Sequence, residues 1–391
     1  MNIQKLKYLD TLFEREMQEG RIGGASLVVN HKGKEVFRNV YGSDKEDSIY
    51  KVFSMTKPIT TVAAMMLYEQ GIIDLYEPVS NYLEGYKNMK VSTKDGLVDA
   101  VRPITLQHLL NMTSGLVYPG EDRESDQVME QVRIRLHERA VKAREEGRSL
   151  SNLDIINTIG EEVPLQFQPG EGWRYGFSAD ALAGVVEAIT GIPYGEYLQK
   201  TIFEPLGMKD TGFYIEESQI HRLAQMYSRI DEEGHLKKAD EKAYEWLNMY
   251  APTKPPYIES GGGGLYSTLE DYNHFVQMLA AGGSYNGHNF IGRKTVDYIA
   301  TNQLNEQQMK CVDFDSIIGY GYGNFMRVMM NPALAASNGS VGEYGWDGLP
   351  GTYFFIDPKE ELTLVYMQQI EQGADQSLRR KMRQIIYGAL E

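Results

Sequence analysis

The amino-acid sequence predicts a layered fold of the α/β (α+β) class, because strand-like and helix-like segments occupy different parts of the chain. Apolar and polar residues alternate near both ends, at 25–42 and at 351–369. From about 74 to 210 the pattern is mostly helical, and a closing helix is expected from about 377. This order predicts one sheet-containing domain built from both ends of the chain, with a mostly helical domain inserted in the middle.

Each of the two alternating segments predicts a β-hairpin. The first, ASLVVNHKGKEVFRNVYG, begins at residue 25 and turns at Lys32-Gly33. The second, GTYFFIDPKEELTLVYMQQ, begins at residue 351 and alternates on both sides of Pro358. Period-two alternation around a short turn is typical of paired strands with one face buried.

Helical spacing of apolar residues marks three further segments, at 3–17, 54–70 and 268–281. Gly20 supplies a stop for the first of them, and a glycine-rich run precedes the third. Residues 121–149 form a charged stretch of mixed sign, which predicts a solvated surface helix or lid.

Composition excludes several functional classes. The chain has 391 residues, of which 42% are hydrophobic and 24% charged, so a sizeable core is expected and disorder is not. A net charge of −15 argues against a nucleic-acid partner. The one cysteine, Cys311, excludes an intramolecular disulfide and is expected to be buried. No apolar run approaches the ~18 residues of a membrane span, so a cytoplasmic protein is expected.

The tetrapeptide Ser54-Met55-Thr56-Lys57 has the spacing of a nucleophile and its base. Positions i and i+3 share a helix face, so Ser54 and Lys57 are expected to lie within reach of each other at the start of the predicted helix. The spacing alone is weak evidence, because a helix-capping role for Ser54 would also place a serine there. A second match, Ser48 to Lys51, falls in an extended stretch, where i and i+3 face opposite ways.

Other chemistries find no support in the sequence. It contains no G-x-S-x-G elbow, no H-x-x-x-H pair and no C-x-x-C motif. Its G-x-G runs do not open a dinucleotide-binding unit. We therefore expect neither a metal nor a cofactor.

Longer blocks of sequence resemble a known superfamily, that of the serine β-lactamases and penicillin-binding proteins. The tetrapeptide at Ser54 looks like its first motif. The flanking blocks resemble its class C-like branch, which holds class C β-lactamases, D-amino-acid peptidases, family VIII carboxylesterases and related acyltransferases. Those blocks are TLQHLLNMTSGL (105–116), PGEGWRYGFSADALAGVVEAITG (169–191), PLGMKDTGF (205–213) and GGGGLYST (261–268).

The resemblance implies roles for a second motif. Tyr175 matches the tyrosine of that motif and would act as general base with a lowered pKa beside Lys57. Phe177 stands where β-lactamases carry an amide that helps to bind acylamino groups, and this departure argues against β-lactam hydrolysis. Phe177 would instead contact substrate, and the spacing from Tyr175 to Asp180 is closer to that of family VIII esterases. Ser178 and Asp180 are expected to cap the following helix.

The third motif also departs from β-lactamases. Trp346-Asp347-Gly348 stands where they carry Lys-Thr-Gly, so the lysine that binds a substrate carboxylate is absent. By resemblance, the three residues would contact substrate, and Asp347 would repel anions. The backbone amides of Ser54 and Leu349 would form the oxyanion hole.

The resemblance thus implies a β-lactamase-like fold, with an antiparallel sheet flanked by helices. The predicted sheet domain covers 1–70 and 260–391, the predicted helical lobe covers 71–259, and the active site is expected between them. The predicted activity is that of a serine hydrolase, a carboxylesterase or acyltransferase, on small neutral esters. The alternatives are a β-lactamase or D-amino-acid peptidase, and a non-catalytic ligand-binding member of the superfamily.

Overall fold

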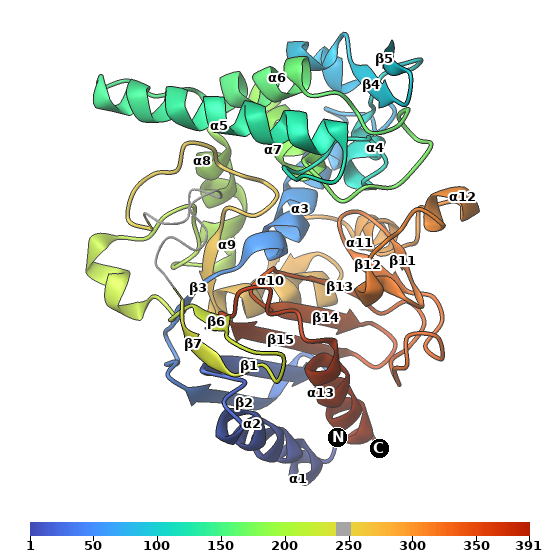
Figure 1. The fold of residues 1–391 in the computed structure, drawn as a ribbon. Helices are drawn as coiled ribbons and strands as arrows, with labels where there is room; N and C mark the ends of the chain where they lie inside the picture. The colour runs from blue at the N-terminus through green and yellow to red at the C-terminus, as the bar shows by residue number, and fades with distance from the viewer. Residues whose placement is uncertain (240–251) are drawn as a thin grey trace.

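The computed structural model describes residues 1–239 and 252–391, and its centre is a seven-stranded antiparallel sheet (Figure 1). The strand order is β11-β12-β13-β14-β15-β1-β2. Strands from the two ends of the sequence therefore meet inside one sheet, as predicted. The bounds are β1 Gly24–His31, β2 Lys34–Gly42, β11 Tyr320–Tyr322, β12 Arg327–Met329, β13 Tyr344–Asp347, β14 Tyr353–Asp357 and β15 Leu362–Gln368.

Both predicted hairpins are present. β1 and β2 pair around the turn at Lys32-Gly33, and β14 and β15 pair around the turn that follows Asp357. The two hairpins join through β1 and β15, in a register that runs from Ala25 opposite Gln368 to His31 opposite Leu362. This pairing makes the sheet continuous across the chain.

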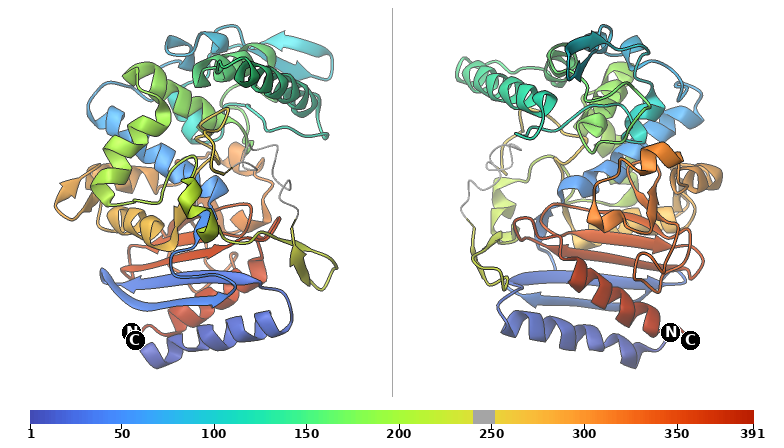
Figure 2. Two further views of the ribbon diagram at one scale, coloured as in Figure 1. Left: turned by 90° about the vertical axis from the view of Figure 1, so that its left-hand side faces the viewer. Right: turned by 45° about the vertical axis from the view of Figure 1, so that its right-hand side comes forward.

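Helices cover both faces of the sheet. On one face lie α1 (Ile3–Leu6), α2 (Tyr8–Gln18) and α13 (Gln376–Gly388), and their apolar side chains form a core with the inner face of β1, β14 and β15. On the other face lies α10 (Leu269–Ala280), with α3 (Thr56–Glu69) beyond it. Both views in Figure 2 keep these two groups of helices on opposite sides of the sheet.

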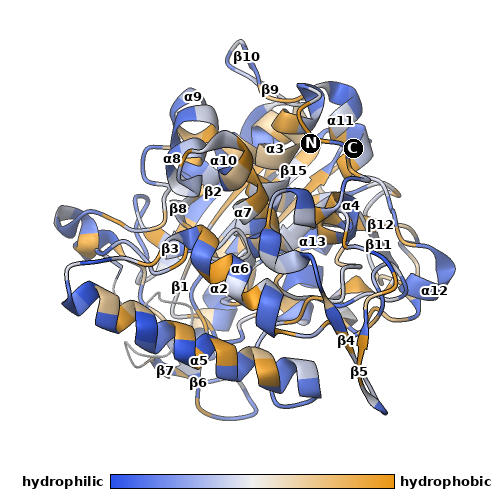
Figure 3. Ribbon diagram, turned by 90° about the horizontal axis from the view of Figure 1, so that it is seen from above, coloured by the Kyte–Doolittle hydropathy of each residue, from blue (hydrophilic) through white to orange (hydrophobic). Residues whose placement is uncertain are grey.

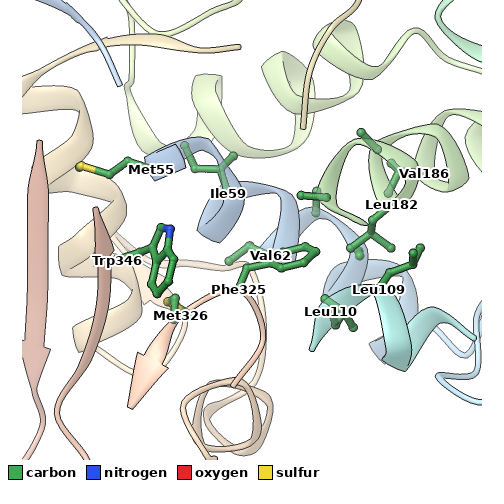
Figure 4. Packing of buried hydrophobic residues seen from close by; sticks show 14 of the residues in the cluster. Met55, Ile59, Val62, Leu109, Leu110, Leu182, Val186, Phe325, Met326 and Trp346 are labelled. Atoms are coloured by element: carbon green, nitrogen blue, oxygen red, sulfur yellow. The ribbon is translucent and has the colours of Figure 1, made fainter. Parts of the chain in front are cut away.

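The second part of the molecule is mostly helical and lies beyond α3. Its helices are α4 (Leu106–Leu110), α5 (Glu124–Glu145), α6 (Asn152–Glu162), α7 (Ser178–Thr190), α8 (Tyr194–Leu198) and α9 (Glu204–Leu206). The helix α3 is buried along almost its whole length between this part and the sheet. Figure 4 shows Ile59 and Val62 of α3 among Leu182 and Val186 of α7, Leu109 and Leu110 of α4, and Phe325. The predicted lobe of 71–259 includes 240–251, which lie outside the described residues.

Short elements complete the described chain. Four further strand pairs are β3–β8, β4–β5, β6–β7 and β9–β10. Their bounds are β3 Ile49–Lys51, β4 Lys90–Thr93, β5 Gly96–Asp99, β6 Tyr227–Arg229, β7 Leu236–Lys238, β8 Tyr266–Thr268, β9 Ser284–Tyr285 and β10 His288–Asn289. Two short helices, α11 (Arg293–Ile299) and α12 (Glu306–Met309), precede β11. No helix within the described residues is long and apolar enough to cross a membrane.

Two expectations about local structure were wrong. The first predicted helix is broken at Lys7 into α1 and α2. The middle of the described chain is mostly helical, as expected, although β4 and β5 form a hairpin within it. Cys311 is exposed rather than buried. By contrast, α5 lies on the outside of the molecule as expected, and Figure 3 shows hydrophilic and hydrophobic bands alternating along it.

Candidate active site

Ser54 lies in a 3₁₀ turn, Phe53–Met55, immediately before α3. The residue before it, Phe53, has φ of 47°, in the left-handed region that a side chain other than glycine rarely adopts. Such backbone strain is concentrated at functional sites, where the surrounding fold enforces it. Pro58 falls within the first turn of α3, where the missing N–H costs nothing.

Lys57, in the first turn of α3, is completely buried and makes three hydrogen bonds. Its Nζ lies 3.1 Å from Ser54 Oγ, 3.0 Å from the Tyr118 hydroxyl and 2.6 Å from the Gly262 carbonyl oxygen. The spacing of Ser54 and Lys57 thus brings the two side chains together. The acceptors on the other sides fix the direction of the ammonium group toward Ser54.

Burial lowers the pKa of Lys57 into the range in which its amine can act as a base at neutral pH. Removal from water lowers its pKa from about 10.5 to about 7, although the charges of Asp180 and Asp347 oppose this shift. A substantial fraction of Lys57 is therefore neutral at pH 7. A neutral amine 3.1 Å from a serine hydroxyl can accept its proton.

Tyr175 connects Ser54 to the sheet. Its hydroxyl accepts a hydrogen bond of 3.1 Å from Trp346 Nε1 of β13, and it also shares a hydrogen bond with the Ser54 side chain. The ring of Tyr175 lies under Lys57, with Nζ 4.5 Å from the ring centroid. Tyr175, Ser54, Lys57 and Trp346 therefore form one contiguous group.

The expectation that Tyr175 has a lowered pKa was wrong. Burial raises the pKa of Tyr175 above its ordinary value, and the hydrogen bonds from Ser54 and Trp346 compensate only in part. Because Lys57 lies against the ring face rather than at the hydroxyl, it stabilises a tyrosinate poorly. The hydroxyl of Tyr175 is thus a neutral donor and acceptor, and Lys57 is the better base.

The backbone around Leu349 lies close to the Ser54 turn. A Cβ on Gly348 would lie 2.4 Å from the Val52 carbonyl oxygen, so only glycine permits this approach. Among the hydrogen bonds of the described residues, neither the Ser54 N–H nor the Leu349 N–H has an acceptor. Two free amides beside a nucleophile are what an oxyanion hole requires.

The sequence analysis did not identify Tyr118, and it assigned Asp180 only to a helix cap. Tyr118 belongs to no recognisable sequence motif, although it lies two residues after the block TLQHLLNMTSGL. Asp180 is buried, accepts hydrogen bonds from Ser260 Oγ and the Gly262 N–H, and has one oxygen, Oδ2, without a partner. A Cβ on Gly262 would lie 2.5 Å from Asp180 Oδ2 and 2.6 Å from the Tyr118 hydroxyl, so these groups crowd around Lys57.

The expected capping of α7 by Ser178 and Asp180 is absent. The N-cap of α7 is Phe177, and no side chain caps it. Ser178 Oγ instead bonds to Ser114 Oγ at 2.8 Å. Asp180 is held by Ser260 and the Gly262 N–H, because its side chain points to the glycine-rich run rather than to its own helix end.

The structure also corrects the expectation for Asp347. Trp346 and Asp347 are neighbours in β13, so their side chains leave opposite faces of the sheet. Trp346 faces Tyr175, whereas Asp347 pairs with Arg379 of α13 and lies 3.5 Å from Arg327. Burial raises the pKa of Asp347, but the two arginines outweigh burial and hold it below its usual value. Asp347 is therefore a structural carboxylate and does not contact substrate at the Ser54 site.

A cavity of about 100 Å³ adjoins this group beneath α5 and α6. Its polar lining comes from Tyr118, Asp180, Ser260, Arg133 and His137, and Phe177 is one of its apolar walls. The remaining lining is Pro119, Met129, Leu136, Ile155, Ile159, Tyr257 and Ile258. Phe177 thus lies in a cavity that Tyr118, a hydrogen-bond partner of Lys57, also lines.

One group of described residues has the composition of a metal site. Ligand atoms of Asp231, Glu233 and His235 lie within 4.8 Å of one another between β6 and β7, and all three residues are exposed. This group shares no residue with the Ser54 site, and nothing in the chemistry of Ser54 and Lys57 requires a metal.

Comparison with known families agrees with this geometry. The sequence model of the family described as Beta-lactamase matches residues 9–387, nearly the whole chain. The chain belongs to the beta-lactamase family. The predicted superfamily and the predicted β-lactamase-like fold are thereby confirmed.

Several known proteins resemble this chain along most of its length. Protein Rv1367c of Mycobacterium tuberculosis is 29% identical over 339 residues, which cover 83% of this chain and 78% of that protein. Esterase EstB of Burkholderia gladioli is 26% identical over 402 residues, covering 97% and 94% of the two chains. Among solved structures, EstCE1, described as a hydrolase with promiscuous acyltransferase activity, has a TM-score of 0.78 at 22% identity and covers 99% of both chains.

Proposed function

We propose that the protein is a serine hydrolase that cleaves small neutral carboxylic esters through an acyl-enzyme on Ser54. One observation carries the proposal: Lys57 Nζ lies 3.1 Å from Ser54 Oγ, in a setting that lowers its pKa to about 7. The similarity to esterase EstB over almost the whole of both chains supports an ester as substrate.

The acylation step uses groups already in place. Neutral Lys57 takes the hydroxyl proton as Ser54 Oγ attacks the ester carbonyl, and the N–H groups of Ser54 and Leu349 stabilise the resulting oxyanion. The tetrahedral intermediate then collapses, and protonated Lys57 returns the proton to the leaving alkoxide. Tyr175 holds Ser54 Oγ through its neutral hydroxyl, which Trp346 orients.

Deacylation repeats the sequence with water or a second alcohol. The incoming hydroxyl gives a proton to Lys57 and attacks the acyl carbon, and Ser54 Oγ leaves and recovers the proton. Water yields a carboxylic acid, whereas an alcohol yields a new ester. The resemblance to EstCE1, whose description includes acyltransferase activity, makes transfer to an alcohol the second candidate activity.

Neutral esters fit the charge of the site better than penicillins do. No cation replaces the lysine of Lys-Thr-Gly at Trp346, and the partly buried Asp347 is neutralised on the far face by Arg379. A substrate carboxylate placed at Trp346 would thus lose hydration without meeting the cation that Lys-Thr-Gly supplies, at a cost of several kcal/mol. The apolar cavity lined by Phe177 offers an acyl chain a dry surface instead.

The test is a substrate panel together with covalent labelling. We expect turnover of p-nitrophenyl butyrate, a much lower kcat/KM for a chromogenic cephalosporin and for D-alanyl peptides, and a fluorophosphonate adduct that maps to Ser54. A cephalosporin kcat/KM equal to that of the butyrate ester would favour a β-lactamase instead. Absence of both labelling and turnover would favour a non-catalytic ligand-binding protein.

A further inference from the structure

A second cavity lies on the opposite face of β13 from the Ser54 site. Its volume is about 140 Å³, and it is enclosed by the β11–β12 strands, residues 334–337 and the first turns of α13. A buried water needs only about 15 Å³ of such space, so the cavity has room for a ligand of several heavy atoms. Ile318 and Leu334, both exposed, lie at its rim.

The lining of this cavity is strongly basic. It includes four arginines and, among the described residues, no carboxylate: Arg327, Arg379, Arg380, Arg383, Ser316, Ile318, Tyr320, Leu334, Ala335, Ala336, Ser337, Tyr353 and Gln376. Arg327, Arg379 and Arg383 are at least 96% buried, whereas Arg380 is exposed at the rim. Buried guanidinium groups cannot lose their protons, so they require anionic or hydrogen-bonding partners.

Arg383 is fully satisfied by Glu343 and by two residues of the cavity wall. It donates to Glu343 Oε1 at 2.7 Å, to the Tyr353 hydroxyl at 3.0 Å and to Ser337 Oγ at 2.7 Å. Arg383 therefore has its own carboxylate and serves as a fixed part of the wall.

Arg327 and Arg379 are not satisfied in this way. Nη1 of Arg327 and Nη2 of Arg379 are both buried and without a hydrogen-bond acceptor. Both side chains share a single carboxylate, Asp347: Arg379 Nη1 hydrogen-bonds to its Oδ2, and Arg327 Nη1 forms an ion pair with the same oxygen at 3.5 Å. Their guanidinium carbons lie 4.9 Å and 5.0 Å from the centroid of Tyr353, so this ring holds both in place.

We propose that this cavity binds a small oxyanion, a phosphate or carboxylate group, through the guanidinium groups of Arg327 and Arg379 that line it. Guanidinium groups bind such anions through pairs of parallel hydrogen bonds, which are about twice as strong as those between neutral groups. Tyr353 and the ion pair of Arg383 with Glu343 hold the site open before the anion enters. Arg380 at the rim attracts the anion from solvent.

The first test measures binding to the whole protein. Inorganic phosphate and acetate are titrated separately, against sodium chloride at matched ionic strength, with the melting temperature as readout. We expect at least one of the two oxyanions to raise the melting temperature beyond the effect of chloride. Arg380→Gln should weaken that binding, whereas Lys294→Gln, an equal charge change on the exposed side of α11, should not.

The second test locates the anion. A crystal grown with selenate should give an anomalous peak within hydrogen-bond distance of Arg327 and Arg379. Arg327→Gln should weaken anion binding at least tenfold, as expected for the loss of a charged hydrogen bond. If Arg327→Gln does not fold, the position of the selenate peak and the anion affinity of Arg380→Gln still test the proposal. A response equal to that of chloride, or a selenate peak only elsewhere, would overturn the proposal.

Discussion

The indole N–H of Trp346 donates a 3.1 Å hydrogen bond to the Tyr175 hydroxyl, and this contact joins the sheet to the helical part of the molecule beside Ser54. Trp346 comes from β13, whereas Tyr175 lies just before α7. The two rings also pack with their centroids 5.6 Å apart. The position of the Tyr175 oxygen is therefore set by a residue 171 positions away in the sequence.

Tyr175→Phe should keep this ring packing and remove only the hydroxyl. We expect kcat for p-nitrophenyl butyrate to fall by about 10²-fold or more, because Ser54 loses the group that positions it. Steady-state kinetics on the folded variant would measure this fall. Tyr197→Phe, which removes a buried hydroxyl outside the Ser54 group, serves as the control. Near-normal turnover by Tyr175→Phe would remove the tyrosine from the mechanism.

Ser54→Ala should abolish covalent catalysis. We expect kcat to fall by about 10³-fold or more, with loss of fluorophosphonate labelling measured by intact mass. Ser48→Ala tests the second Ser-x-x-Lys match, which lies beside β3. We expect the fluorophosphonate to label this variant as fully as it labels the unchanged protein. An adduct on another residue in an active Ser54→Ala variant would refute the assignment.

The rate should depend on pH through Lys57. The base is the neutral amine, and the pKa of Lys57 is about 7, so kcat/KM should be low at pH 5.5, rise through about pH 7 and level off above pH 8. A pH–rate profile with a butyrate ester measures this directly. A flat profile from pH 5.5 to 9 would show that Lys57 is not the base.

Asp180→Asn should move that profile to lower pH. The Asp180 charge raises the pKa of Lys57, so its removal makes the lysine more acidic. Asparagine keeps an oxygen for the hydrogen bonds from Ser260 and the Gly262 N–H, so the fold should survive. A purely structural role would lower kcat without moving the midpoint. Asp154→Asn, an exposed carboxylate on α6, is the control.

Phe177→Leu should widen the apolar cavity while retaining an apolar side chain. We expect the ratio of kcat/KM for octanoate over butyrate esters to rise several-fold, as the wall beside Tyr118 recedes. Phe275→Leu, on the buried face of α10, is the matched change away from the cavity and should leave the ratio unaltered. An unchanged ratio in Phe177→Leu would show that this cavity does not bind the acyl chain of the substrate.

The local periodicity of apolar residues was sufficient to predict the main strands and helices of the sheet-containing part. The hairpins β1–β2 and β14–β15, the helix α10 and the start of α13 each depend on residues close together in the sequence, so alternation and helical spacing located them. The break at Lys7 and the β4–β5 hairpin were not predicted, because neither produces a regular pattern of apolar residues over a long enough stretch of sequence.

The site was predictable only where its residues share a motif. Ser54 and Lys57 lie on one turn, so their spacing in the sequence was enough to predict their contact. Tyr175 was predicted from the resemblance to the superfamily. Tyr118 reaches Lys57 from 61 residues away, and no local pattern reports that contact. Asp347 was misplaced for the same reason, since its partner Arg379 comes from a different element.

The pairing of β1 with β15 has a consequence for how the chain acquires its fold. His31 pairs with Leu362, so an inner edge of the early hairpin stays open until nearly the whole chain has been made. At synthesis rates of about 5–20 residues per second, that delay is on the order of tens of seconds. A newly made β1–β2 hairpin thus offers an unpaired, apolar strand to any neighbour throughout that time, and chaperone supply should govern the yield of active protein during expression.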